Sequence, residues 1–236
     1  MFPIAQLTYV PDDDFEIWLE LHRADGSSCL IGDTLSLGNG IGNDDYVITA
    51  KINTLTYLNI INEYITDLTG IQDFAALTHL YCQDNQLTIL DLSNNTNLIE
   101  LDCNHNQLTS LDLSNNSALT FLECNNNDLN CLNIQNGNNT NLQFWSQNNP
   151  NLTCIEADDP TWATANFTSW QSIDSSVTFS TNCNYPLGCF STPTTITEQT
   201  NNINLYPNPT NNLITLDIEG YNGSVNVRYM IYKEGC

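Results

Sequence analysis

A 21-residue repeat is the feature that most limits how this chain can fold. Three near-copies start at Leu77, Leu98 and Leu119, and read LTHLYCQDNQLTILDLSNN, LIELDCNHNQLTSLDLSNN and LTFLECNNNDLNCLNIQNG. A looser fourth copy starts at Leu142, and a divergent first copy starts at Leu55. A short fixed period of this kind is typical of units that stack on one another and share a continuous core.

Each copy contains a short alternation of apolar and polar residues that predicts one strand. Apolar residues two positions apart give a strand with one buried face. Strands of successive copies then lie parallel, joined by right-handed connections. The expected inward pairs are Leu80/Cys82, Leu101/Cys103, Leu122/Cys124 and Trp145/Gln147.

The apolar residues that follow each strand must turn the chain and fill the interior. A coil of 21 residues leaves little room for a full return helix, so we expect extended or 3₁₀ segments there. A second short strand is expected around the segments ILDLS, SLDLS and CLNIQ.

Asparagine recurs at fixed places in the repeat. Asn85, Asn106 and Asn127 follow the strand at an inward position, where an amide can donate to and accept from the backbone of adjacent coils. We therefore expect these three to form a buried structural ladder. The pairs expected in tight left-handed turns are Asn94/Asn95 and Asn115/Asn116.

The shared pattern L-x-x-L-x-C-x-x-N-x-L-x-x-L-x-L resembles the leucine-rich repeat with cysteine at the third apolar position. The resemblance covers residues 55–157. It implies a right-handed solenoid with a parallel β-sheet on one face and an extended or 3₁₀ convex side.

The segments on either side of the repeats are expected to cover the ends of the core. In residues 11–54, the run Pro11-Asp12-Asp13-Asp14 can cap a short helix whose Phe15, Trp18, Leu19 and His22 share one face. In residues 158–192, Asp159 and Pro160 start a second helix, followed by a final strand within residues 176–181. The apolar residues expected on that second helix are Trp162, Phe167 and Trp170.

The last segment, residues 193–236, has a different composition. The sequence YPNPTNN from Tyr206, followed by alternating residues 213–217 and 225–227, resembles the type A C-terminal sorting domain of type IX secretion. That family implies export across the outer membrane by the machinery that reads the tail. The ending RYMIYKEGC lacks the further strands of the family, so we interpret this small β-domain as truncated.

The N-terminal segment PDDDFEIWLEL, the repeats and the tail together resemble internalin-like secreted repeat proteins. The family implies surface display or release, and recognition of proteins or glycans. Residues 1–10 are either the remnant of a leader or part of the mature chain, and both interpretations stay open.

The charge of the chain excludes several classes of partner. Against 27 Asp and Glu stand 4 Lys and Arg, a formal charge of −23. Such a field repels phosphate backbones and anionic membrane surfaces. The sequence also has no apolar run of the length that spans a bilayer.

The cysteines divide into two groups. Cys82, Cys103 and Cys124 occupy an inward strand position, where we expect buried free thiols. Cys131 and Cys154 hold equivalent positions in consecutive copies and form the favoured disulfide. The pair Cys183/Cys189 comes next, while Cys29 and Cys236 have no evident mate.

The exposed face of the strands is the candidate binding site for a protein or glycan, because it mixes aromatic rings with carboxylates and amides. We expect a secreted or cell-surface binding protein and a monomer, with no catalytic residues, cofactor or metal. The alternatives are a secreted hydrolase that uses Asp102 and Glu123, although an open face has no walls to raise a pKa, and a structural spacer. The expected face residues are His79, Tyr81, Gln83, Glu100, Asp102, Asn104, Phe121, Glu123, Asn125 and Phe144.

Overall fold

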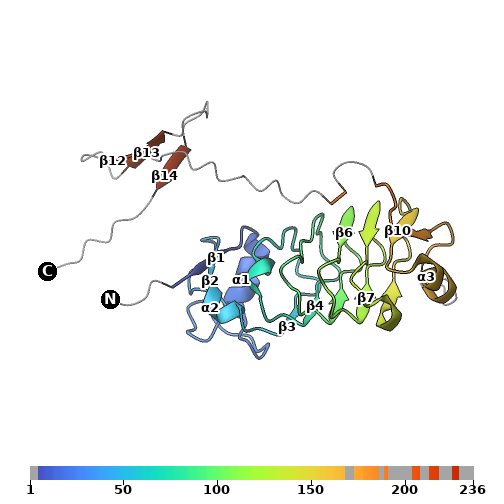
Figure 1. Ribbon diagram of the computed structural model, residues 1–236. Helices are drawn as coiled ribbons and strands as arrows, with labels where there is room; N and C mark the ends of the chain where they lie inside the picture. The colour runs from blue at the N-terminus through green and yellow to red at the C-terminus, as the bar shows by residue number, and fades with distance from the viewer. Residues whose placement is uncertain are drawn as a thin grey trace. The chain divides into compact units, whose positions relative to one another are not determined.

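The computed structural model describes residues 5–167, 173–185 and 189–190, and the backbone of three later strands. The chain divides into two compact units, Met1–Phe190 and Ser191–Cys236. The first unit contains the repeats, which stack as successive coils between two terminal helices (Figure 1).

One strand from each of five copies joins a parallel five-stranded sheet. The pairing is in register, so Leu80 lies beside Leu101 and Leu101 beside Leu122, all fully buried. These leucines therefore form one interior column. In sheet order the strands are β3 (Tyr57–Asn59), β4 (His79–Tyr81), β5 (Glu100–Asp102), β7 (Phe121–Glu123) and β9 (Gln143–Trp145).

A second parallel sheet lies on the opposite side of the coils (Figure 1). It contains the second strands expected at SLDLS and CLNIQ, whereas residues 89–93 of ILDLS form no strand. The C-terminal strand expected within residues 176–181 joins its edge. In sheet order the strands are β11 (Thr178–Ser180), β10 (Cys154–Glu156), β8 (Cys131–Asn133) and β6 (Ser110–Asp112).

Buried thiols stack beside the leucine column. Cys82, Cys103 and Cys124 are fully buried and unpaired, as expected from their inward position. Burial raises the pKa of all three thiols far above the ordinary value, because a thiolate would lose its hydration. These cysteines therefore act as small apolar fillers of the core.

Asparagine side chains connect the coils through the backbone. Asn106 donates from Nδ2 to the carbonyls of Cys82 and Cys103, at 3.0 and 3.2 Å, and accepts from the amide of Leu87 at 2.9 Å. Asn85 and Asn127 make equivalent bonds in their own coils. Each side-chain amide thus forms hydrogen bonds with buried backbone groups that have no partner in a neighbouring strand.

The expected left-handed turns lie elsewhere. Asn95 and Asn116 are fully buried, and they donate to carbonyls of the preceding coil. Their backbone angles are ordinary, so the expectation of left-handed asparagine pairs was wrong. The positive φ angle belongs instead to the residue just before each ladder asparagine, namely Asp84, His105, Asn126 and Asn148.

The N-terminal segment packs against the first coil. It contains β1 (Leu7–Tyr9), α1 (Asp13–Leu21), β2 (Tyr46–Ile48) and α2 (Thr49–Ile52), with β1 and β2 antiparallel. Asp12 starts α1 by accepting a hydrogen bond from the amide of Phe15 at 2.9 Å. Phe15 stacks on Phe74 at 6.1 Å, which joins the helix to the core of the repeats.

The other end of the repeats carries α3 (Pro160–Phe167), where Asp159 accepts from the amides of Thr161 and Trp162. Phe167 meets Phe144 edge-on at 5.2 Å, so α3 also packs against the core. Trp170, expected on this helix, lies outside the described residues. The described residues of this unit also include the 3₁₀ turns η1 (Ile71–Asp73) and η2 (Asn139–Asn141).

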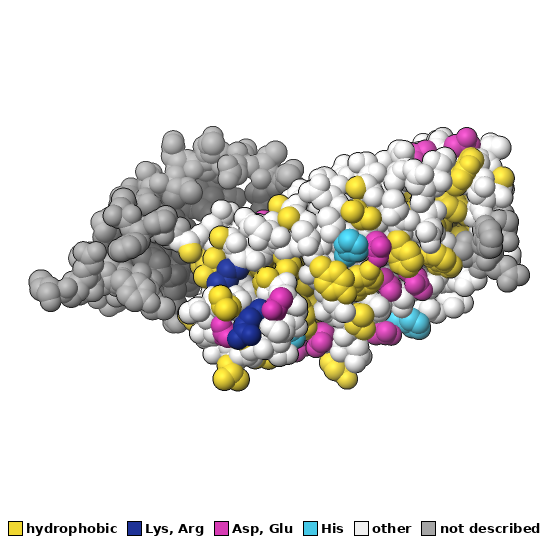
Figure 2. Space-filling model, turned by 90° about the horizontal axis from the view of Figure 1, so that it is seen from below, with side chains coloured by type: hydrophobic (Ala, Val, Ile, Leu, Met, Phe, Trp, Pro, Cys, Tyr) yellow, Lys and Arg dark blue, Asp and Glu magenta, His cyan; other side chains and the backbone are white. Residues whose placement is uncertain are grey.

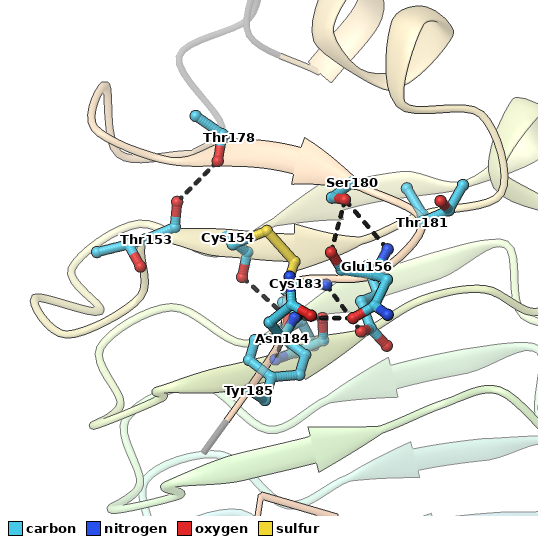
Figure 3. The surroundings of a disulfide bond; sticks show 12 residues. Thr153, Cys154, Glu156, Thr178, Ser180, Thr181, Cys183, Asn184 and Tyr185 are labelled. Atoms are coloured by element: carbon cyan, nitrogen blue, oxygen red, sulfur yellow. Dashed lines mark hydrogen bonds between the residues drawn. A yellow bond between two sulfur atoms is a disulfide. The ribbon is translucent and has the colours of Figure 1, made fainter.

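The disulfides differ from the expected pairs. Cys154 bonds to Cys183, and Cys131 bonds to Cys189, each with a Cα–Cα distance of 5.8 Å. The favoured Cys131–Cys154 bond and the Cys183–Cys189 bond were therefore wrong. The physical reason is that the chain after β11 returns across the second sheet and brings Cys183 to Cys154 of β10 (Figure 3). Cys189 likewise reaches Cys131 of β8.

Hydrogen bonds hold this returning segment in place as well. The hydroxyl of Tyr185 donates to the carbonyl of Leu132 at 2.7 Å, and Cys183 donates its amide to Glu156 at 3.0 Å. Residues 181–185 are thus fixed to β8 and β10 by covalent and polar contacts together (Figure 3).

The second unit contains a small antiparallel sheet. Its strands are β12 (Asn204–Pro207), β13 (Leu213–Asp217) and β14 (Val225–Arg228), with β13 paired to both others. The first strand overlaps the start of the YPNPTNN motif.

Candidate binding face of the repeats

The outward side of the five-stranded sheet is the candidate site, and we call it the β-face. Figure 2 looks onto this side and shows hydrophobic and acidic side chains gathered in a band across the strands. Because side chains alternate along a strand, the first and third residues of each three-residue strand point outward. These outward residues are Tyr57, Asn59, His79, Tyr81, Glu100, Asp102, Phe121, Glu123, Gln143 and Trp145.

Aromatic pairs lie towards both ends of the β-face. Tyr57 of β3 meets Tyr81 of β4, with 5.5 Å between ring centroids. Phe121 of β7 meets Trp145 of β9 at 5.3 Å. Both pairs join the first residue of one strand to the third residue of the next, so the two pairs are equivalent positions three strands apart.

Acidic groups lie on β5, which separates the aromatic pairs, and on the neighbouring β7. Glu100 accepts a hydrogen bond from the hydroxyl of Tyr81 and lies 3.8 Å from Nε2 of His79. That hydrogen bond to a carboxylate raises the pKa of Tyr81 to about 12, because ionising the phenol would break it. Glu123, one strand further on, accepts from the amide nitrogen of Asn125 at 2.9 Å.

Asp102 departs from the expected solvated acid. It is 8% exposed, and burial raises the pKa of its carboxyl to about 6, with the neighbouring Glu123 adding to the effect. Its Oδ1 accepts from the backbone amide and the side chain of Asn104, at 3.2 and 2.7 Å. The expectation that Asp102 is exposed, and that this face raises no pKa, was wrong because neighbouring side chains on the sheet cover the carboxylate.

Phe144 also departs from its expected place. It is 3% exposed and pairs with Leu122, so it belongs to the interior column. The fourth copy is one residue shorter between its first buried leucine and its strand, which shifts the alternation by one position. Gln143 and Trp145 consequently face outward, and Ser146 takes the core position beside Cys124.

The remaining predicted face residues share one environment. They are half-buried, and they lie on the β-face or immediately after its strands. These residues are His79, Tyr81, Gln83, Glu100, Asn104, Phe121, Glu123 and Asn125.

A pocket lies at each end of the β-face. The pocket near α1, about 410 Å³, includes Tyr57 and Asn59 of β3 together with Trp18 and Glu63. The pocket near α3, about 430 Å³, includes Gln143 and Trp145 of β9 together with Trp162. The band of aromatic and acidic side chains therefore ends in a hollow on both sides.

Three residues of the β-face and of the asparagine ladder were not predicted from the sequence. Tyr57 lies in the divergent first copy, and Trp145 was placed inward by the shifted alignment. Asn149, fully inside, makes the fourth set of ladder bonds, including one that it accepts from the amide of Leu129 at 3.1 Å. Anchoring the fourth copy on Asn149 instead of Leu142 would have found both Asn149 and Trp145.

Comparisons with known proteins connect the repeats to internalins. The chain is 44% identical to internalin J of Listeria monocytogenes over 52 residues, which are 22% of this chain and 6% of that protein. The LVIVD repeat family matches residues 81–102, about the length of one repeat. The chain is thus similar to an internalin over 52 residues, and it spans a small part of the length of that relative.

Similar solved structures come from the same group of proteins. The functional domain of InlJ from Listeria monocytogenes, described as including a cysteine ladder, is 27% identical with a TM-score of 0.45, over 66% of this chain and 39% of that one. Internalin C2 of the same species is 21% identical with a TM-score of 0.42, over 66% of this chain and 80% of that one.

None of the helices in the described part of the chain combines the length and apolar character needed to cross a membrane.

Proposed function

We propose that this chain is a secreted or cell-surface leucine-rich-repeat protein that binds a protein or a glycan through the β-face. One observation carries the proposal: two aromatic pairs flank a band of carboxylates on an open sheet face, with a pocket at each end. Aromatic rings supply large apolar contact area, and carboxylates and amides supply directional hydrogen bonds. The similarity of 52 residues of this chain to internalin J supports the same function.

The proposal assigns a role to each part of the chain. Residues 55–157 form the right-handed solenoid, and residues 11–54 and 158–192 are its N-terminal and C-terminal caps. Residues 193–236 are a linker and a sorting domain that the type IX export machinery reads. The protein acts as a monomer and without a cofactor.

A screen against arrays of glycans and displayed peptides tests this function. The wild-type chain is compared with the double variant Tyr81→Ala/Phe121→Ala, which removes one ring from each aromatic pair. Tyr46→Ala, which alters an exposed ring on β2 away from the β-face, is the control. We expect the double variant to lose the ligands that the wild type and the control retain. Unchanged binding of every ligand by the double variant would contradict the proposal.

The raised pKa of Asp102 keeps a second candidate, a secreted hydrolase, open to test. A carboxyl with a raised pKa next to a second carboxyl, here Glu123, is the pairing that general acid–base hydrolysis of glycosides uses. We favour binding, because Asn104 and Asn125 hold these carboxylates and the pockets lie at the ends of the β-face. Turnover of a glycan that Asp102→Asn abolishes would establish the hydrolase instead.

A further inference from the structure

The charge of the β-face between the two end pockets is negative. Glu100, Asp102 and Glu123 lie in its centre, and Glu63 lines the pocket near α1. The basic residue of that pocket, Arg23, is already bonded to Asp33 at 2.5 Å. A partner that covers the β-face must therefore bring positive charge, since buried carboxylates without a cation are costly.

One side-chain oxygen beside the acidic centre lacks a hydrogen-bond donor within the described part of the chain. It is Oε1 of Gln83, two residues beyond β4, which is buried. Asp102, more than nine-tenths buried, accepts through its Oδ1 from Asn104. Buried polar atoms are normally satisfied, so Gln83 points to a donor-rich group supplied by the ligand.

The spacing of the aromatic pairs sets the length of that ligand. The pairs are equivalent positions three strands apart, which at the usual strand spacing is about 14 Å. An extended peptide advances about 14 Å in four residues, and its side chains at positions one, three and five point to the same side. Those three side chains would meet an aromatic pair, the acidic centre and the second aromatic pair.

We infer that the β-face recognises an extended segment of a protein partner that carries arginine or lysine, with an apolar or aromatic residue two positions away on each side. The inference rests on the proposed function, and it selects a cationic polypeptide over a neutral glycan. Arginine suits the centre best, because a guanidinium donates to neighbouring carboxylates in a planar fork and also stacks on aromatic rings.

Fluorescence anisotropy with short labelled peptides tests the inference on the full chain. The probe has the sequence Trp-Ser-Arg-Ser-Trp with blocked termini, and the comparison peptides replace arginine with glutamine or glutamate. Binding is measured up to millimolar concentration at low and high salt. We expect the arginine peptide to bind at least about tenfold more tightly than the other two, with a difference that shrinks as salt screens the charges.

Matched variants then test whether the preference for the arginine peptide depends on the carboxylates of the β-face. Glu100→Gln/Glu123→Gln removes two charges at nearly constant shape, and it should reduce the preference for arginine to about twofold or less. Asp128→Asn removes an exposed charge outside the β-face and should leave the preference intact. Since both variants keep the core residues, circular dichroism should report the same fold for each.

The outcomes separate this inference from the proposed function. Absence of peptide binding, or equal binding of all three peptides, would overturn the inference. If a neutral oligosaccharide binds instead and Tyr81→Ala/Phe121→Ala abolishes that binding, the proposed function stands without the cationic ligand. Peptide binding that no β-face variant alters would overturn both.

Discussion

Asp102 and Glu123 are direct neighbours across the parallel strands β5 and β7, and Asp102 is the more deeply buried of the two. The pair sits in the middle of the β-face, with an aromatic pair on each side. Burial of the Asp102 carboxylate costs folding stability. A carboxylate buried at such a position is typical of a surface adapted to bind a ligand.

The burial of Asp102 predicts a pH-dependent cost in stability. The native state retains the proton up to about pH 6, whereas the unfolded chain releases it near the ordinary aspartate pKa of 3.8. The native state therefore binds more protons between these values, so this contribution to the free energy of unfolding falls as pH rises through that window. Asp102→Asn should raise the free energy of unfolding at pH 7.5 by on the order of 1–2 kcal/mol, and change it little at pH 4.

Urea unfolding of both proteins at the two pH values checks this prediction. Asp112→Asn, at an exposed position of β6, is the control, and its effect should not vary with pH in the same way. A stability difference for Asp102→Asn that is the same at pH 4 and pH 7.5 would contradict the assigned burial.

The asparagine ladder predicts a large cost for one truncation. Asn106→Ala would leave two carbonyls and one amide of the interior without their partners. We expect a loss of about 2–4 kcal/mol in the free energy of unfolding. Asn94→Ala, at an exposed position of the same coil region, should cost less than about 0.5 kcal/mol in the same urea titration. Equal losses for the two variants would show that the ladder does not support the stack.

The disulfide pairs predict a specific peptide map. Proteolysis without reduction should yield fragments joined through Cys154–Cys183 and Cys131–Cys189. Replacing Cys154 and Cys183 together by serine should destabilise the chain by about 3 kcal/mol, because the bond closes a loop with a sequence separation of 29 residues. Recovery of a Cys131–Cys154 fragment by mass spectrometry would instead favour the pairing expected from the repeat.

The register of β9 predicts opposite effects at two adjacent residues. Phe144→Ala should lower the free energy of unfolding by about 3–4 kcal/mol, since it leaves a cavity in the interior column. Trp145→Ala should cost far less stability and should weaken ligand binding, because this ring faces outward beside Phe121. Thermal melts measure the stability of both variants, and the peptide titration measures their binding. A large loss of stability for Trp145→Ala and a small one for Phe144→Ala would instead favour the alignment that places Trp145 in the interior.

The sequence period was enough to locate the interior column. Leu80, Leu101 and Leu122 have the same spacing and the same neighbours, so their register follows from the repeat alone. The same reasoning failed at Phe144, because a strand reverses its faces when a single residue is lost. Periodicity predicts which residues of a strand face the interior only where the spacing of the repeat is kept.

Contacts made by distant segments were beyond sequence reasoning. Cys131 and Cys154 look equivalent within the repeat, but their partners arrive on a returning chain whose path the repeat does not encode. The burial of Asp102 likewise depends on side chains contributed by neighbouring coils, and no local pattern at Asp102 reports it. Both features belong to tertiary packing and not to the repeating unit.

Hydroxyl-radical footprinting tests the β-face most directly. The chain is oxidised alone and when saturated with the arginine peptide or with a ligand selected from the arrays, and modified residues are quantified by mass spectrometry. Binding should protect Tyr81, Phe121 and Trp145, while Tyr46 and Ile89, which are exposed elsewhere, keep their reactivity. Protection of Tyr46 or Ile89, with the three β-face rings as reactive as before, would contradict the account.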